Sequence, residues 1–398
     1  MEVRLLRQEE QLELDKLETI AFVGSMDVEE AQKRYEKEPG GHWKYTWGCF
    51  NDAGKLTAAV INNPFRCWYE GKSVAMGGVG GVASLPEGRT KGAVRSIMRA
   101  IFADMREKGE FLSALYPFSH SYYAQYGYAL CNMPNRVVLP MKALKKFRQA
   151  MEARMHLKGE PLDDFKTVYD RFAGAYNLAI DRDEAVWKST MDGDSYKDRR
   201  YRYLLYQDGQ PRAYVNFHPG EPKYKGAGHM AVVDQLAFDG PEALYNVLGF
   251  MSKLSAQYGH VQMTLPGDID LSVLMDEPYE CEYARAFSGM ARLVNVQQAL
   301  ELLRVPQGEG ECTIRVEDEF LPENSGCYRL SYAQGALTVE KGDFECALCL
   351  NEGTLCQLCL GALSMEQARW KPDVQIQSEN PALWALFPGK KVLLTNGF

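Results

Sequence analysis

The stretch Gly80–Phe102 reads GGVASLPEGRTKGAVRSIMRAIF, a pattern typical of a strand, a short turn and a helix. The turn is basic, because Arg89 and Lys91 come just before the helix begins near Ala93. Backbone N–H groups and the dipole at a helix start attract anions, and glycine lets a ligand approach the backbone closely. The stretch therefore predicts an anion-binding turn that suits a pyrophosphate. The alternative is a solvated helix start with incidental charges.

Two common phosphate loops are excluded by their spacing. The tripeptide Gly71-Lys72-Ser73 matches the end of a P-loop, but Arg66 occupies the position where that loop needs its first glycine. The glycine-rich run at residues 77–81 lacks the G-x-G-x-x-G spacing of a dinucleotide-binding turn.

The same plan occurs twice along the chain. A strand hairpin, a further strand, a turn, a helix and another strand follow in this order in both the first and the middle segments. In the second copy, MAVVDQLAFDGPEALYNVLGFMSKL (residues 230–254), the turn DGPE is acidic and would repel an anion. The last segment predicts a third, α+β domain. The expected domains, of mixed α+β and α/β class, span residues 1–135, 136–285 and 286–398.

Composition and charge narrow the function classes. The chain has 398 residues, enough for two or three domains, and a formal net charge of −8 from 45 Lys and Arg against 53 Asp and Glu. An acidic chain is a poor candidate for binding nucleic acid and a suitable one for a cationic small substrate. The N-terminus is charged from its second residue, and the sequence has no run of 18 apolar residues. We therefore expect a cytoplasmic protein without membrane contact.

Four of the ten cysteines form a C-x-x-C pattern twice, at Cys346 and Cys349 and at Cys356 and Cys359. This pattern allows a structural zinc site. The alternative is a set of reduced core thiols, because the first pair lies on a predicted strand, where residues three apart face opposite sides. Leucine, and not glycine, follows each pair. We therefore expect no bound metal.

The basic turn also carries a family resemblance. Arg89-x-x-Gly92 resembles the acetyl-coenzyme A (acetyl-CoA) loop of the Gcn5-related N-acetyltransferases (GNATs), although Val94 stands where that pattern has Gly or Ala. The segment at residues 82–86 is similar to the splayed strand that holds the pantetheine arm in this family. The resemblance implies acetyl-CoA as co-substrate, bound by Val82, Ala83, Ser84, Arg89, Thr90, Lys91, Gly92 and Ala93.

A second segment sharpens the resemblance. YYAQYGYAL (residues 122–130) resembles the Tyr-x-x-Phe-Gly-Tyr segment of the Eis-like (enhanced intracellular survival) acetyltransferases, and Tyr123 falls where that family has its general acid. The family has an active GNAT domain, a degenerate second copy and a C-terminal sterol-carrier-protein-like (SCP2-like) domain. The segment ARLVNVQQALE (residues 291–301) resembles the beginning of that third domain. The resemblance covers essentially the whole chain. It implies a homo-oligomer, specifically a hexamer.

The end of the chain, KVLLTNGF (residues 391–398), carries a further implication of the resemblance. In this family the terminal carboxylate, on a Phe, reaches into the active site as a base, which gives that role to Phe398. Gly397 stands where the family has an acidic residue. An apolar, aromatic ending favours docking over the fraying that is usual for a terminus.

The implied reaction moves an acetyl group directly from acetyl-CoA to a primary amine of a cationic small molecule, such as an aminoglycoside, a polyamine or a lysine-like compound. A tyrosine hydroxyl suits the proton donor, although Tyr123 alone would read as one packing aromatic among 22 tyrosines. His120 is a rival base. Asp27, Glu29 and Glu30 either attract the amine or simply favour a helix start. The alternative function is a lipid or sterol carrier with a vestigial acetyltransferase domain.

Overall fold

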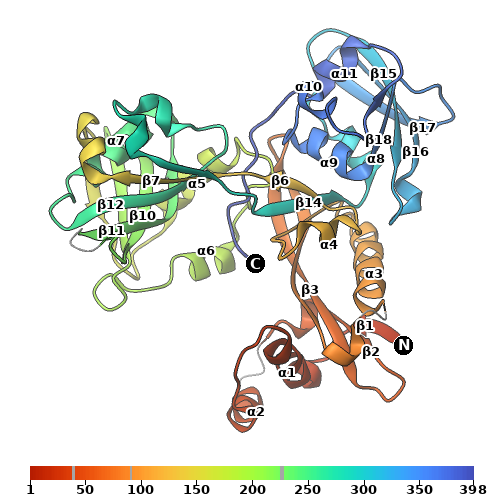
Figure 1. The fold of residues 1–398 in the computed structure, drawn as a ribbon, viewed down its shortest axis with the longest axis horizontal. Coiled ribbons are helices and arrows are strands. Elements are labelled where there is room, and N and C mark those ends of the chain that lie inside the picture. The colour runs from red at the N-terminus through yellow and green to blue at the C-terminus, as the bar shows by residue number, and fades with distance from the viewer. Residues whose placement is uncertain (38–40, 90–91, 225–227) are drawn as a thin grey trace. The chain divides into compact units, whose positions relative to one another are not determined.

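The computed structural model describes residues 1–37, 41–89, 92–224 and 228–398. The chain forms two compact units, and each is described by itself. The first unit comprises Met1–Cys131, Gly289–Lys390 and Asn396–Phe398, and the second comprises Asn132–Ser288 and Lys391–Thr395. Figure 1 labels their helices and strands.

The first unit contains a seven-stranded mixed sheet with the order β1-β2-β3-β4-β5-β14-β6. Its strands are β1 (Glu2–Leu5), β2 (Thr46–Phe50), β3 (Leu56–Tyr69), β4 (Lys72–Ser84), β5 (Leu112–Leu115), β14 (Gly289–Leu293) and β6 (Ala129–Asn132). Strands β3 and β4 form a long hairpin whose turn residues, Glu70 and Gly71, have φ angles of 53° and 77°. Two positive φ angles give the type I′ turn that matches the twist of a hairpin. Strand β5 then pairs parallel to β4.

Helices pack against both faces of this sheet (Figure 1). They are α1 (Gln11–Ala21) on one face and α3 (Ala93–Glu107) with α4 (His120–Ala124) on the other, whereas α2 (Val28–Lys37) packs against α1. Successive side chains of β3 divide between two apolar clusters, because Ala58 and Val60 pack with α3 whereas Ala59 packs with α1. Helix α3 contributes Ile97 and Ile101 to the first cluster, and both are fully buried.

The second unit repeats this sheet. Its strand order is β13-β7-β12-β11-β10-β9-β8. The elements are β7 (Asn135–Pro140), β8 (Glu152–Met155), α5 (Asp163–Ala173), α6 (Glu184–Thr190), β9 (Tyr201–Gln207), β10 (Gln210–Gly220), β11 (His229–Phe238), α7 (Gly240–Ser252), β12 (Tyr258–Leu265) and β13 (Glu282–Arg285). Strand β11 pairs antiparallel with β10 and parallel with β12, as β4 does with β3 and β5. The duplication predicted from the sequence is therefore confirmed.

Each of the two repeated sheets contains one strand that follows the other sheet's strands along the chain. In the first sheet β14 is the antiparallel neighbour of β5, and in the second sheet β7 is the antiparallel neighbour of β12. Along the chain, however, β7 follows the first copy and β14 follows the second. From the sequence, the strand that contains β14 was expected to begin the third domain. Its residues are all buried inside the first sheet instead.

The first unit also holds a five-stranded α+β domain with the strand order β17-β16-β15-β18-β19. Its elements are α8 (Val296–Glu301), β15 (Gly310–Glu317), β16 (Gly326–Ala333), β17 (Ala336–Gly342), β18 (Leu348–Asn351), α9 (Glu352–Leu360), α10 (Met365–Ala368), β19 (Gln375–Ile376) and α11 (Pro381–Leu386). The β3–β4 turn anchors it. The buried Glu70 carboxylate accepts hydrogen bonds from Lys390 Nζ at 2.6 Å and from the Arg304 backbone N–H at 3.1 Å. The predicted fold class, tandem mixed sheets followed by an α+β domain, is confirmed.

All ten cysteines are free thiols. Cys346 neighbours Cys327, and Cys356 neighbours Cys131. Among the described residues, no group of three or more His, Cys, Asp or Glu side chains is arranged to hold a metal ion. In the same part of the chain no helix combines the length and the apolar character that crossing a membrane requires.

Candidate active site

Strands β4 and β5 separate within the first sheet. Their pairing joins Met76–Val79 to Leu112–Leu115, and the rest of β4 pairs only with β3 among the described strands. A bulge accompanies the separation, because Gly81 adopts a φ of 54° where the β3 register shifts. The open edge of β4 can therefore pair with an extended ligand. Three residues that the family resemblance assigned to acetyl-CoA lie there: Val82, Ala83 and Ser84.

The turn after β4 leads into α3 through Gly92, which has a left-handed φ of 77°. A Cβ there would meet no described atom within 4 Å, so the backbone conformation, and not crowding, favours glycine. Ala93 is buried, which leaves its backbone as the group that can face a ligand. Arg89 is exposed and extended. Thr90 and Lys91 lie outside the described residues.

Tyr123 lies on α4 and is buried in the apolar cluster that also contains Val79 and Leu115, the last paired residues of β4 and β5. Burial raises the pKa of Tyr123, so its phenol keeps its proton at neutral pH. The other buried tyrosine hydroxyls of the segment have partners. Tyr128 is 2.7 Å from Ser113 Oγ, and Tyr126 donates to Tyr122 at 3.4 Å. Tyr123 is the buried tyrosine of this segment whose hydroxyl has no hydrogen-bond partner among the described residues.

A buried arginine supports the tyrosine segment from β14. The guanidinium of Arg292 donates to the carbonyl of Tyr126 and, at 2.6 Å, to the Asp318 carboxylate. Both side chains of this ion pair are 0 % exposed. Gly127 has a φ of 81°, and a Cβ there would come within 1.8 Å of Arg292 Nη1. The glycine of the Tyr-x-x-Tyr-Gly-Tyr segment is therefore required by both its backbone and its neighbour.

The C-terminal residue, Phe398, packs against β4 at the point where the pairing of β4 with β5 ends. The ring of Phe398 contacts the rings of Phe65 and Tyr116, with centroid distances of 5.0 and 5.5 Å. A Cβ at Gly80 would be 3.3 Å from the carboxyl carbon of Phe398, and a Cβ at Gly78 would be 3.1 Å from its ring. The glycine-rich run therefore makes room for the C-terminus. The Tyr116 hydroxyl holds the chain two residues before Phe398 by donating to the Asn396 carbonyl at 2.7 Å.

The side chain of Glu18 on α1 approaches Gly81, the residue of β4 that follows Gly80. Its Oε1 would be 3.0 Å from a Cβ at Gly81. The side chain is half-buried, and no described residue forms a hydrogen bond or ion pair with it. Burial, together with the nearby Asp15 carboxylate, raises the pKa of Glu18 to about 7. Sequence reasoning missed this residue because the acidic residues of α1 look like a solvated helix face.

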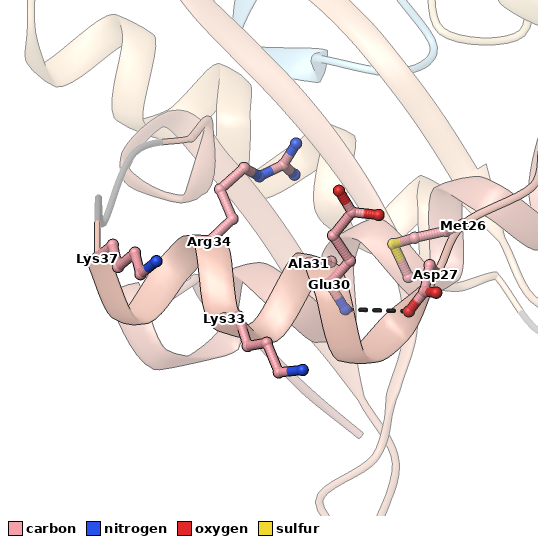
Figure 2. A pocket seen from close by; sticks show the side chains of 7 residues that line it. All are labelled: Met26, Asp27, Glu30, Ala31, Lys33, Arg34 and Lys37. Carbon is pink, nitrogen blue, oxygen red and sulfur yellow. Dashed lines mark hydrogen bonds between the residues drawn. The ribbon is translucent and has the colours of Figure 1, made fainter.

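The rival base and the predicted acidic cluster lie elsewhere. His120 is exposed at the first position of α4. Asp27 caps α2, with its carboxylate accepting from the Glu30 backbone N–H at 3.0 Å. A cavity of about 900 Å³ opens beside α2. Figure 2 shows its lining residues, Met26, Asp27, Glu30, Ala31, Lys33, Arg34 and Lys37.

This cavity has mixed charge. Glu30 and Arg34 project to one side of α2 and Lys33 to the other (Figure 2). Glu29 is not among the described lining residues of the cavity. The hydrogen bond that the Asp27 carboxylate accepts from the Glu30 backbone N–H supports the interpretation of this segment as a capped helix start.

Family models match three segments of the chain. Acetyltransferase (GNAT) domains match residues 2–131 and 178–293, and a sterol carrier protein domain matches residues 296–395. The chain therefore contains two acetyltransferase (GNAT) domains and a C-terminal sterol carrier protein domain. The predicted Eis-like order of domains is thereby confirmed. No curated protein sequence matches the chain.

Solved structures share the fold over the full length of this chain. A GCN5-related N-acetyltransferase from Anabaena variabilis is 23% identical, covers 100% of both chains and gives a TM-score of 0.84. A conserved protein from Enterococcus faecalis, named a probable N-acyltransferase, is 24% identical over 100% of this chain and 99% of its own, with a TM-score of 0.85. Eis1 from Mycobacterium abscessus is 18% identical over 100% of both chains, with a TM-score of 0.81. At these identities the likeness establishes the fold.

Proposed function

We propose that this protein transfers the acetyl group of acetyl-CoA to a primary amine of a cationic small molecule, within a ternary complex. The observation that carries the proposal is the placement of Phe398, whose carboxyl group lies at Gly80 where β4 and β5 separate. Tyr123 belongs to the apolar cluster at the same separation. A donor and an acceptor of protons therefore flank one opening in the sheet.

The β4 edge and the turn before α3 suit acetyl-CoA. The edge of residues 82–84 that faces away from β3 has no strand partner among the described residues, so it suits pairing with the amide groups of a pantetheine arm. The start of α3 offers backbone N–H groups, and Arg89 adds a positive charge for the pyrophosphate. Acetyl-CoA supplies the activated acetyl group, and the protein supplies placement.

The side chains divide the proton transfers. The carboxylate of Phe398 contacts the ammonium group of the acceptor and takes its first proton, because an ammonium ion is not a nucleophile. Tyr123, kept protonated by burial, donates to the sulfur of the leaving thiolate. Direct attack within the ternary complex requires no Cys or Ser nucleophile.

A thiol-release assay with acetyl-CoA over a panel of amines tests the proposal. The panel contains an aminoglycoside, a polyamine and a lysine derivative, with the matching N-acetylated compounds as controls. We expect free coenzyme A to form only with an unblocked primary amine, together with the acetylated product in equal amount. Thiol release that is independent of every amine would contradict the proposal.

The polar lining of one cavity argues against the carrier function of the sterol carrier protein domain. A cavity of about 590 Å³ at its edge is lined by Arg106, Asn295, Gln297, Gln298, Glu301, Glu323, Asn324, Tyr328 and Lys341. Polar and charged side chains of this kind suit a lipid or sterol poorly. The contacts of Phe398 and of the buried Glu70 instead give the domain a structural role beside the first sheet.

A further inference from the structure

We propose that Glu18 is a second acid–base residue of this site, receiving the proton that the acceptor amine loses and passing it to solvent. This inference rests on the proposed acetyltransferase function. It comes from the approach of two carboxyl groups to consecutive residues of β4, with that of Phe398 at Gly80 and that of Glu18 at Gly81.

The two carboxyl groups reach the same face of the sheet. Ile61 of β3 pairs with Gly80, and its side chain would also contact a Cβ at Gly81, 2.6 Å away. The bulge at Gly81 explains this, because it lets consecutive residues point to one side. Helix α1 lies on this face, where it packs with Ala59. Glu18 therefore meets β4 from the side on which the C-terminus ends.

Glu18 has no structural task that accounts for its position. Asp15, one turn earlier on α1, accepts hydrogen bonds from Gln11 and from Tyr35 of α2, whereas no described residue donates to Glu18. A half-buried carboxylate without a donor costs stability. Such a cost is typical of a group retained for binding or catalysis.

The surrounding charges favour proton uptake by this carboxyl group. Asp15 faces it from its own helix, and Arg34 of α2 is 3.8 Å from Asp15 and not paired with Glu18. The Phe398 carboxyl group lies at Gly80, one residue along β4 from the approach of Glu18 to Gly81, and Ile61 presents an apolar surface from β3. Burial and the negative neighbour raise the pKa of Glu18 to about 7. A base that titrates near the working pH is better matched to this step than an ordinary α-carboxylate.

One proton leaves the ammonium ion for the Phe398 carboxylate and moves on to Glu18, which becomes neutral and later releases it to water. The amine nitrogen uses its lone pair to form the new bond to the acetyl carbonyl carbon, and the C–S bond breaks with its electron pair on sulfur. Tyr123 protonates that sulfur, and a second proton from the nitrogen restores the phenol. The products are the amide, the free thiol and one proton in solution.

The activity test compares Glu18→Gln with Glu13→Gln, an exposed residue of the same helix that pairs with Lys16. We expect Glu18→Gln to lower kcat/KM for the amine by about 10²-fold above pH 7, because general base catalysis is worth about this much. The wild type and Glu13→Gln should show an added rise in kcat/KM near pH 7 that Glu18→Gln lacks. Calorimetry should give the same Kd for acetyl-CoA in all three.

A second readout does not depend on turnover. The folded-state pKa of Glu18 is raised above its unfolded value, so the charged carboxylate destabilises the fold above pH 7, and this penalty fades as the pH falls toward 4.5. Glu18→Gln removes the charge. It should therefore raise Tm relative to the wild type at pH 8, with a smaller difference at pH 5, whereas Glu13→Gln should not.

The outcomes separate the two proposals. Acetylation by the wild type, together with an unchanged rate and pH profile in Glu18→Gln, would overturn the role of Glu18 and leave the proposed function intact. A Tm difference that does not depend on pH would overturn the assignment of an unpaired, titrating carboxyl group. A wild type that acetylates no amine would overturn both proposals.

Discussion

At the scale of single residues, Gly127 is the most constrained position near the site. Its left-handed backbone disfavours any side chain, and Arg292 occupies the place that a Cβ would need. Gly109 has a similar φ of 73° but open space at its Cβ position. Substitutions at these two glycines therefore distinguish the free-energy cost of a left-handed backbone from the added cost of a steric clash with Arg292.

We predict that Gly109→Ala lowers the free energy of unfolding by about 1–2 kcal/mol, the usual cost of a left-handed backbone. Gly127→Ala should cost clearly more, because it must also displace the buried Arg292–Asp318 pair. Chemical denaturation of both variants measures the difference. Equal losses would show that Arg292 moves aside without cost.

Tyr123 gives the second prediction at this scale. Tyr123→Phe should lower kcat by about 10²–10⁴-fold, the range for a positioned proton donor, with the Kd for acetyl-CoA unchanged. Tyr128→Phe is the matched control, because that hydroxyl is engaged with Ser113 and should matter mainly for stability. Near-normal turnover by Tyr123→Phe would return Tyr123 to a packing role.

At the scale of elements, the turn between β4 and α3 is expected to bind acetyl-CoA and take no part in the chemistry. We predict that Arg89→Ala with Lys91→Ala raises the Kd for acetyl-CoA about 10- to 100-fold, because charged hydrogen bonds to phosphate are lost. The kcat at saturating acetyl-CoA should stay close to the wild-type value, because these contacts are remote from the reacting carbonyl. Lys108→Ala, at the other end of α3, is the control. A large fall in kcat with an unchanged Kd would contradict this division.

Local sequence patterns predicted the helices, strands and turns better than they predicted which strands pair in a sheet. The hairpin turns at Glu70-Gly71 and Asp208-Gly209 follow from turn chemistry, and both adopt two positive φ angles. The exchange of β7 and β14 was not predictable, because a short strand that is largely or wholly buried carries no signal that specifies its sheet.

In the candidate site, too, local sequence patterns predicted some features, whereas others depend on contacts between distant segments. The strand–turn–helix pattern located the open β4 edge, whereas Tyr116 and Glu18 depend on tertiary contacts. Tyr116 reads as one more aromatic residue after a strand, and Glu18 reads as an acidic residue on an amphipathic helix. The glycine-rich run at residues 77–81 was visible, but its role as a seat for the C-terminus needed the structure.

At the scale of the whole molecule, the two GNAT copies have diverged at their turns. In the second copy Asp239 precedes α7, where its carboxylate lies 3.2 Å from Arg171 and 3.3 Å from Arg212. These pairs neutralise the basic groups nearest to that helix start. The first copy has the basic turn and receives the C-terminus. This asymmetry accounts for one proposed active site among two copies of the fold.

The proposed role of the free Phe398 carboxylate in the active site decides the mechanism. Its most direct test is kcat for amine acetylation by the native chain and by a chain extended with two glycines after Phe398, each carrying the same N-terminal tag. The extension converts the carboxylate into an amide, which cannot accept the proton of the amine, so we predict that the extended chain folds, binds acetyl-CoA with an unchanged Kd and loses at least about 10²-fold in kcat. Phe398→Leu keeps the carboxylate and should retain part of the activity. An extended chain that turns over as fast as the native one would contradict the account.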